Sequence, residues 1–367
     1  MANSLLRGDY VYEEVYPAFK EGTDEKEKTA LLNQVFLQFL LKEGLVFSGN
    51  RSIQVADLGC GPCDTIIKYL KGISFSPGFT VRGIDFNEEY AGSGGKAAAN
   101  LMAAQASGVL KLNQFSVRRG DAFSGHLLDL LCAPGEKAGE HSFRLAFLSH
   151  LMYHAHRQEE IDRVLQDISF HVLEEGGLAV LYHVAHRSPG TFQYFRDRYG
   201  SNSQNTARTD TPTMNIHDPP SVIAESCGRS GIPCRGLEFA TQLYFQRWPE
   251  EVWQAYGDPS RYERLAKTDE GAFEDLKRLY FIVQRSPREF AADASPTGLQ
   301  AYLTEIREVL ERNGGALLLE ETLQVLTPPE VSEAFQVKMG KALSGTEAQM
   351  PVIDREGREE YEKRVSA

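Results

Sequence analysis

The sequence has few cysteines, no long apolar run and no excess of basic charge, and each absence narrows the class of protein. Five cysteines spread over 367 residues do not make a disulfide framework. A net charge of -12 argues against nucleic-acid binding, which needs a basic surface to displace counterions from phosphate. No apolar run is long enough to span a bilayer, and the first residues lack a signal-peptide core. We therefore expect a cytoplasmic protein with reduced thiols that binds neither nucleic acid nor membrane.

Strand-like and helical segments alternate along the chain. Apolar, β-rich runs lie at 53–58, 79–85, 115–121, 143–149, 177–184, 234–245 and 315–326. Helical patterns lie between the first five of these runs, at 63–72, 96–108 and 157–173. Strands that alternate with helices at this spacing indicate an α/β fold. We expect a doubly wound, mostly parallel, seven-stranded sheet.

The remaining segments divide the chain into parts. Apolar residues at helical spacing occupy 24–46, where Asp24 is a candidate N-cap, and a helical stretch rich in aromatic and charged residues precedes the last strand. We expect a helical cap there, whose role is either to cover the substrate or only to stabilise the core. The predicted parts are a helical arm at 1–50, an α/β core at 51–247, the cap at 248–313, the last core strand at 314–327 and a C-terminal extension at 328–367. The sequence does not decide whether the extension is ordered.

The segment VADLGCGPCDT, residues 55–65, combines two motifs with different chemistry. Cys60 and Cys63 form a Cys-Gly-Pro-Cys motif that is typical of redox proteins, but a long helical arm and a first strand precede it. This context favours a ligand-binding turn, in which Gly59 and Gly61 let the backbone bend sharply and approach a ligand. Asp85 ends the second strand, where a carboxylate can accept hydrogen bonds from both ribose hydroxyls.

An NAD site is the alternative nucleoside site, but its G-x-G-x-x-G fingerprint fails because position 64 is Asp. The segments VADLGCGPCD, VRGIDFNEEY, RRGDAFSG, LSHLMYHAHR and LEEGGLAVLYH resemble the ordered motifs of class I S-adenosylmethionine-dependent methyltransferases. The resemblance implies a Rossmann-like methyltransferase fold with S-adenosylmethionine as the cofactor. One departure is Cys63, which stands where the family usually has a third glycine. The residues that the resemblance assigns to the cofactor are Asp57, Gly59 and Gly61 for the methionine part, Asp85 for the ribose, Asp121 near the adenine, and Ser149.

A narrower resemblance, to histamine N-methyltransferase-like small-molecule methyltransferases, extends over most of the chain. It rests on YEEVYPAFKEGTDE in the arm, LSHLMYHA after the fourth strand, HRSPGTFQYFRDRYGS after the fifth, and GGALLLEETLQVL at the last strand. The positions that it implies for the substrate pocket are Tyr12, Tyr16, Glu25, His150, Tyr153, His154 and Glu321. His150 and Glu321 replace amides of that family, so the substrate need not be histamine.

These residue types suit methyl transfer to an amine. Methyl transfer is an in-line displacement in which positioning dominates, and a carboxylate or histidine can remove the proton that keeps an amine unreactive. A second interpretation is structural: Tyr12 and Tyr16 form a helix face, Glu25 is a solvated charge, and His150 and His154 are ordinary histidines. We expect no metal, because no third ligand follows the two histidines at matching spacing.

The sequence therefore predicts an S-adenosylmethionine-dependent enzyme that methylates a small amine or amino acid derivative. A second possible reaction is cyclisation of the cofactor itself, in which its amine attacks the carbon next to sulfur and releases methylthioadenosine and azetidine-2-carboxylate. A third possibility is a protein that binds the cofactor or a partner without turnover. The identity of the acceptor and the oligomeric state stay open.

Overall fold

The computed structural model places helices on both faces of a sheet, with further helices beyond one end of it. The residues that it describes are 12–45, 51–73, 75, 77–132, 142–184, 188–200, 219–246, 250–256, 258–285 and 298–366. Among these residues, no helix has both the length and the apolar character needed to cross a membrane.

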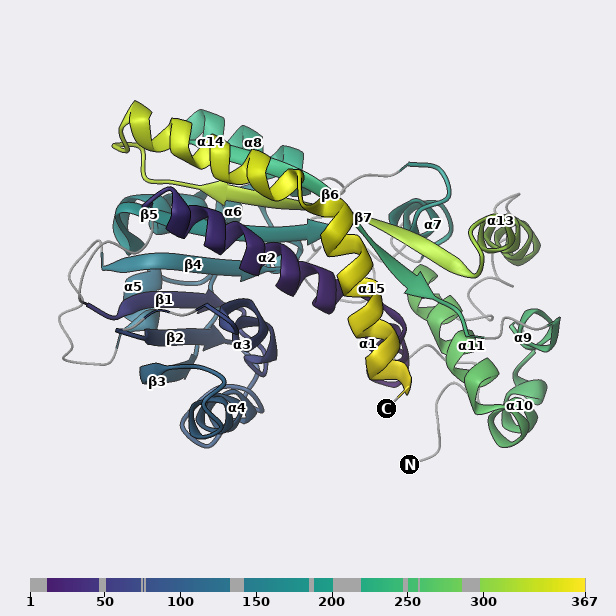
Figure 1. The fold of residues 1–367 in the computed structure, drawn as a ribbon. Coiled ribbons are helices and arrows are strands. Elements are labelled where there is room, and N and C mark those ends of the chain that lie inside the picture. The colour runs from purple at the N-terminus through teal and green to yellow at the C-terminus, as the bar shows by residue number, and fades with distance from the viewer. Residues whose placement is uncertain are drawn as a thin grey trace.

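Seven strands of the described chain form one sheet with the order β3-β2-β1-β4-β5-β7-β6 (Figure 1). The strands are β1 (Ile53–Leu58), β2 (Phe79–Asp85), β3 (Leu112–Arg119), β4 (Phe143–Ser149), β5 (Leu173–Val184), β6 (Cys234–Tyr244) and β7 (Ala316–Leu326). The first five run parallel, and β7 runs antiparallel to both β5 and β6. The expected doubly wound, mostly parallel, seven-stranded sheet is confirmed.

The strand order reverses its direction between β1 and β4, which are hydrogen-bonded neighbours. In open α/β sheets, ligands bind outside the carboxyl ends of the strands at such a switch point. The segments that follow β1 and β4 begin at Gly59 and His150, so the topology by itself directs attention to these two residues.

The described helices form two layers on the faces of the sheet and a third group beyond one end of it. The helices are α1 (Tyr12–Gly22), α2 (Glu25–Lys42), α3 (Asp64–Leu70), α4 (Lys96–Ala106), α5 (Leu127–Leu131), α6 (Gln158–Asp167), α7 (Phe192–Tyr199), α8 (Pro219–Ser230), α9 (Glu250–Ala255), α10 (Tyr262–Thr268), α11 (Glu270–Val283), α13 (Leu299–Arg312), α14 (Glu333–Glu347) and α15 (Met350–Ser366). On one face α2, α3, α4 and α14 share a core with Val55 and Phe147, and on the other α5, α6 and α8 pack against Ala56 and Leu148. Successive strand residues point to opposite faces, which is why neighbours such as Val55 and Ala56 enter different cores.

A third core, which we call the cap core, lies beyond the ends of β6 and β7. It joins the arm helix α1 to α7, α9, α10, α11 and α13, all on the right of Figure 1. Its centre is Arg278 of α11, which is 1% exposed, forms an ion pair with Asp275 at 2.5 Å and donates to the Ala18 carbonyl at 3.0 Å. A buried charge of this kind needs such partners, and the contact to Ala18 ties the arm to the cap.

The C-terminal extension contains two helices rather than open coil. α14 packs on α2 and β6, and α15 crosses α2 to reach the arm (Figure 1). Ser332 caps α14 by accepting a hydrogen bond from the Phe335 amide.

Three local expectations differ from the structure. Asp24 precedes α2 but makes no capping bond; it is fully buried and accepts hydrogen bonds from the Gln242 amide and the Tyr244 hydroxyl instead. The helix expected at 157–173 ends at Asp167, and a single π-helical turn leads directly into β5. β5 therefore begins at Leu173, earlier than the apolar pattern indicates.

Candidate functional site

The turn after β1 is bonded to the end of β2. The amides of Gly59 and Cys60 both donate to the Ile84 carbonyl, at 2.9 and 3.0 Å, and the Gly61 amide donates to Asp85 Oδ2 at 2.7 Å. Gly59 and Gly61 have φ values of +70° and +51°, a left-handed conformation that glycine adopts without strain. A Cβ at Gly61 would meet no atom within 4 Å, so the backbone there is open to a ligand.

Asp85 is held between two backbone segments. Its Oδ2 accepts from Gly61, and its Oδ1 accepts from the Asn87 amide at 2.8 Å. A carboxylate offers about four lone-pair sites, so both oxygens keep capacity for ligand hydroxyls. The side chain therefore has a fixed orientation before any ligand arrives.

Asp57, at the end of β1, differs from Asp85. It is 6% exposed, and its Oδ2 has no hydrogen-bond partner among the described residues. Burial, together with the charges of Asp85 and Asp64, raises the pKa of Asp57 to about 7. The Asp57 side chain does not line the pocket described below, whereas Gly59 in the following turn does.

The two cysteines of the turn are structural. Cys60 is 5% exposed and Cys63 is fully buried, and both belong to the core that includes α3 and Phe147. The neighbouring Cys63 thiol and burial together raise the pKa of Cys60 far above its usual range. A buried thiol that resists ionisation is a poor redox nucleophile, which supports the turn interpretation of this motif.

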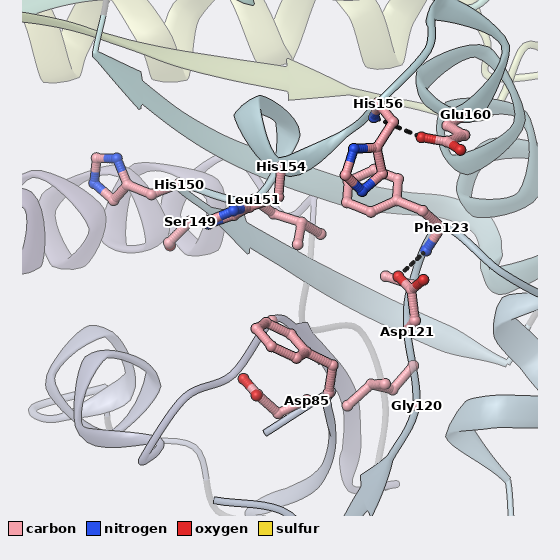
Figure 2. Close-up of a pocket in the computed structure, with 14 residues that line it drawn as sticks. Asp85, Gly120, Asp121, Phe123, Ser149, His150, Leu151, His154, His156 and Glu160 are labelled. Atoms are coloured by element: carbon pink, nitrogen blue, oxygen red, sulfur yellow. Dashed lines mark hydrogen bonds between the residues drawn. The ribbon is translucent and has the colours of Figure 1, made fainter. Parts of the chain in front are cut away.

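A pocket of about 390 Å³ lies at the carboxyl ends of the parallel strands. Segments that follow four strands line it: Gly59 after β1, residues 84–86 at β2, residues 120–123 after β3 and residues 149–151 after β4. Asp85, Asp121 and Glu160 supply its carboxylates, and Asp121 is oriented by the Phe123 amide, which donates to its Oδ1 at 2.9 Å (Figure 2).

Two aromatic side chains and two histidines complete this pocket. Phe86 lines it although its side chain is 69% exposed, and Phe123 lines it from the loop after β3. His154 lines the pocket, and His156 lies next to Glu160, which accepts a hydrogen bond from the His156 amide (Figure 2). A large exposed ring beside two carboxylates is unusual on a protein surface and suits a planar ligand that carries hydroxyl groups. Motif spacing gave no signal for Phe86 or Phe123, because neither belongs to a catalytic residue type.

His150 connects the pocket to a buried cluster of charges. Its ring points away from Asp121 in Figure 2, and its Nε2 lies 2.8 Å from Glu25 Oε1. Single side-chain atoms of Glu25, His150 and Glu321 all lie within 4.8 Å of one another. Glu321 is 1% exposed; its Oε1 accepts from Thr241 at 2.5 Å, and its Oε2 has no partner among the described residues.

The backbone of His150 is strained. Its φ is +54°, and its amide donates to the Tyr182 carbonyl of β5 at 2.9 Å. Such a conformation in a residue other than glycine is uncommon and is typical of functional sites. It turns the imidazole from the end of β4 toward the start of α2.

The charges of the cluster shift one another's titration. Burial opposes ionisation of Glu25 and His150, but their mutual attraction outweighs it, so the pKa of Glu25 is lowered and that of His150 is raised to about 9. Burial, and then the negative charge of Glu25, raises the pKa of Glu321 to about 8. Near neutral pH the cluster therefore holds an ion pair and a mostly protonated carboxyl group.

The remaining predicted site residues lie elsewhere or outside the description. Tyr16 packs in the cap core, with ring centroids 6.2 Å from Phe19 and 5.8 Å from Phe281, and Lys20 lies over its ring. Ser149 lines the pocket, and its hydroxyl lies 3.2 Å from that of Tyr69. The side chains of Tyr12 and Tyr153 lie outside the described part of the structure.

The expectation that no metal binds rested on the spacing of the histidines alone. In the structure the possible additional ligands of His150 come from far along the chain, in Glu25 and Glu321. Two carboxylates and one imidazole at this separation are a donor set that a divalent cation can accept. The same set can equally receive an ammonium group.

Comparisons with known proteins find distant structural similarity only. No protein-family model matches the sequence, and no curated protein matches it. The YcgJ protein of Bacillus subtilis is 16% identical, with a TM-score of 0.41 over 80% of this chain and 98% of that one. A methyltransferase of Methanosarcina mazei that depends on S-adenosylmethionine is 14% identical, with a TM-score of 0.38 over 76% and 94%. A geranyl diphosphate methyltransferase in complex with S-adenosylmethionine is 11% identical, with a TM-score of 0.36 over 79% and 84%.

Proposed function

We propose that this protein is an S-adenosylmethionine-dependent transferase that methylates the amine of a small molecule or amino acid derivative. One observation carries the proposal: a single pocket has carboxylates and an exposed ring at one end and His150 at the other. The first end suits a nucleoside, and the second leads to the Glu25–His150–Glu321 cluster, which suits a cationic amine.

The residues of the pocket fit the nucleoside part of S-adenosylmethionine. Asp85 has lone pairs left for the ribose hydroxyls, Phe86 offers an uncovered face for the adenine, and Asp121 lines the same pocket. The open backbone at Gly61 leaves room for the methionine part. When bound, S-adenosylmethionine supplies an electrophilic methyl group on its sulfonium.

The cluster supplies what an amine acceptor needs. An amine arrives at neutral pH as an ammonium ion and becomes a nucleophile only after it loses a proton. Glu321 has its pKa at about 8, so it can accept that proton only in its ionised form, whose fraction grows as the pH rises toward 8. The His150–Glu25 ion pair is nearly neutral as a unit, so the ionised form of Glu321 is the charge that attracts the ammonium group, and a bound ammonium group in turn favours that ionised form.

The charge balance also favours an amine over a metal ion in this cluster. A divalent ion would have to displace the proton of His150, which the neighbouring Glu25 holds tightly, and the proton of Glu321. An ammonium group needs only the loss of the proton on Glu321, because it leaves the proton of His150 in place. Zinc and manganese salts are added in separate samples of the assay below as controls for a metal ion in this cluster.

One reaction tests the proposal and its alternatives. The protein is incubated with S-adenosylmethionine alone and with a panel of small primary amines that includes histamine, and the nucleoside products are identified by mass spectrometry. We expect S-adenosylhomocysteine only when an amine is present. Methylthioadenosine formed from the cofactor alone, faster than its spontaneous breakdown, would replace methyl transfer by cofactor cyclisation. Neither product above the blank, with S-adenosylhomocysteine still bound in calorimetry, would indicate a binding protein.

A further inference from the structure

The corner between α1 and α2 carries Glu25 to the cluster. α1 ends at Gly22, α2 begins at Glu25, and only Thr23 and Asp24 lie between them. The pair between Glu25 and His150 therefore depends on where this short corner is held.

The inner side of the corner is held by β6. Thr23 forms a bridge with Leu243, the Asp24 amide donates to the Gln242 carbonyl at 3.2 Å, and the Gln242 amide donates back to Asp24 Oδ1 at 2.7 Å. These bonds fix the backbone of Asp24 against the sheet edge. They leave the carbonyl groups on the outer side of the corner for another partner.

That partner is Arg364, near the end of α15. Its guanidinium donates to the Thr23 carbonyl at 2.7 Å and to the Lys20 carbonyl at 3.2 Å, and its Nε lies 3.4 Å from Glu27 Oε1. The last carbonyls of a helix lack partners within the helix, and a cation placed there also interacts favourably with the helix dipole. Arg364 thus closes the C-terminal end of α1, more than 300 residues away in sequence.

Further contacts keep α15 in place for this role. The Tyr361 ring stacks on Tyr244 with centroids 4.6 Å apart, and Asp354 pairs with Lys28 at 3.3 Å. Tyr244 donates to Asp24 and Lys28 lies 3.3 Å from it, so the inner and outer supports meet at one residue. Figure 1 shows α15 running across α2 to the arm.

We propose that Arg364 is a positioning residue of the candidate active site, which holds the α1–α2 corner so that Glu25 stays against His150. Its expected effect on turnover rests on the proposed function, but its effect on the Glu25–His150 pair does not. The C-terminal extension then helps to position Glu25 in the site, in addition to covering the core.

The titration of His150 reports this positioning without any substrate. Its titratable neighbours are Glu25, Glu321, Lys26, His154 and His183. Glu25 gives the largest stabilisation of the His150 imidazolium. Displacing Glu25 therefore lowers the midpoint of the His150 titration, whereas a uniform loss of protein stability leaves that midpoint unchanged. NMR of the protein labelled with carbon-13 at histidine measures the midpoint, and His150→Gln identifies the signal.

Three variants of the full chain separate the outcomes. Arg364→Ala removes every contact, Arg364→Gln keeps amide donors for the two carbonyls, and Lys363→Ala is the matched control, because Lys363 is 67% exposed and pairs only with Glu360 of its own helix among the described contacts. We expect the His150 midpoint to fall by about one unit or more in Arg364→Ala. We expect a smaller fall in Arg364→Gln and none in Lys363→Ala.

An unchanged midpoint in folded Arg364→Ala would overturn the proposal, even if its melting temperature fell. If Arg364→Ala does not fold, Arg364→Gln decides by the same criterion. Calorimetry with S-adenosylhomocysteine keeps the two proposals apart, since the contacts described for α15 are with α2, Tyr244 and the arm rather than with the turn after β1. Failure of the wild type to bind this ligand would overturn the proposed function and leave the titration result standing.

Discussion

Two adjacent carboxylates of β7 show how much the surroundings decide at the scale of a residue. Glu321 points into the sheet side that faces α2, where it is 1% exposed, whereas Glu320 accepts a hydrogen bond from the Ser188 amide at 3.4 Å on the other side. Burial, and then the charge of Glu25, raises the pKa of Glu321 to about 8. The period of two along a strand therefore separates a candidate proton acceptor from an ordinary acidic residue.

Replacing Glu321 by Gln tests its role in proton transfer. The amide keeps the shape but cannot take a proton, so we expect turnover of an amine to fall about tenfold or more. The limb of the pH–rate profile that rises near pH 8 should disappear. Glu320→Gln is the matched control and should leave both quantities unchanged. A Glu321→Gln enzyme with the wild-type profile would remove this residue from the chemistry.

Replacing Asp85 by Ala tests the cofactor site. The variant loses the carboxylate that we assign to the ribose and also the bond to the Gly61 amide. We expect calorimetry with S-adenosylhomocysteine to show binding weaker by about 1.5–3 kcal/mol, the range for hydrogen bonds to a charged group. Glu88→Ala, which removes an exposed carboxylate that pairs with Arg119, should bind normally. Equal affinities in the two variants would contradict the assignment.

At the scale of an element, the turn between β1 and α3 depends on backbone geometry more than on its thiols. The Cys63 amide donates to the Cys60 carbonyl at 2.9 Å, and Cys63 itself has a φ of +60° where the methyltransferases that these motifs resemble usually have glycine. Its side chain is nevertheless fully buried, so packing compensates for the strain. The turn keeps the shape of a ligand-binding loop with an unusual residue in it.

We expect Cys63→Ala to retain binding of S-adenosylhomocysteine, with a loss of about 1 kcal/mol or more in the free energy of unfolding from the lost packing. The wild-type protein should not reduce insulin disulfides, since the hydrogen bond with Cys63 and burial raise the pKa of Cys60 far above its usual range. Turbidity measurements of insulin with the purified protein check this directly. Robust reduction would restore the redox interpretation of the Cys-Gly-Pro-Cys motif.

At the scale of the whole molecule, the site joins parts that are distant along the chain. Glu25 comes from the arm, His150 from the central strands, and Glu321 from a strand that follows the cap helices. The same cluster makes the free energy of unfolding depend on pH. At pH 7 the folded protein holds protons on His150 and on Glu321 that the unfolded chain releases, because both folded pKa values exceed the unfolded ones.

Stability without ligand should therefore fall as the pH rises from 7 to 9. The folded state binds more protons than the unfolded state in this window, so the stabilisation is lost as the pH passes the folded pKa values of about 8 and about 9. Denaturant unfolding should show a decrease of about 3 kcal/mol. Glu321→Gln should flatten part of this slope. A stability that rises over the window would show that the cluster does not hold these protons.

The sequence by itself determined the sheet and the position of the glycine turn after β1. Asp57 and Asp85 end strands whose apolar patterns are local, and parallel neighbours bring such ends to one edge. The limits of β1, β2 and β4 agree with the patterns because their residues are buried on both faces. The resemblance in the motifs named His150 and Glu321 as candidates, but sequence spacing gave no distance between them.

Tertiary structure decided the properties that depend on contacts between distant segments. Asp24 is a residue type that often caps helices, but its side chain accepts hydrogen bonds from Gln242 and Tyr244 of β6, more than 200 residues later. The pKa values of His150 and Glu321 follow from burial beside Glu25, which requires the corner after α1 and an antiparallel strand after the cap helices. Arg364 shows no motif, and its contact with Thr23 exists because α15 folds back across α2. Local patterns encode secondary structure, whereas charge interactions depend on distance in space, which only the packed fold sets.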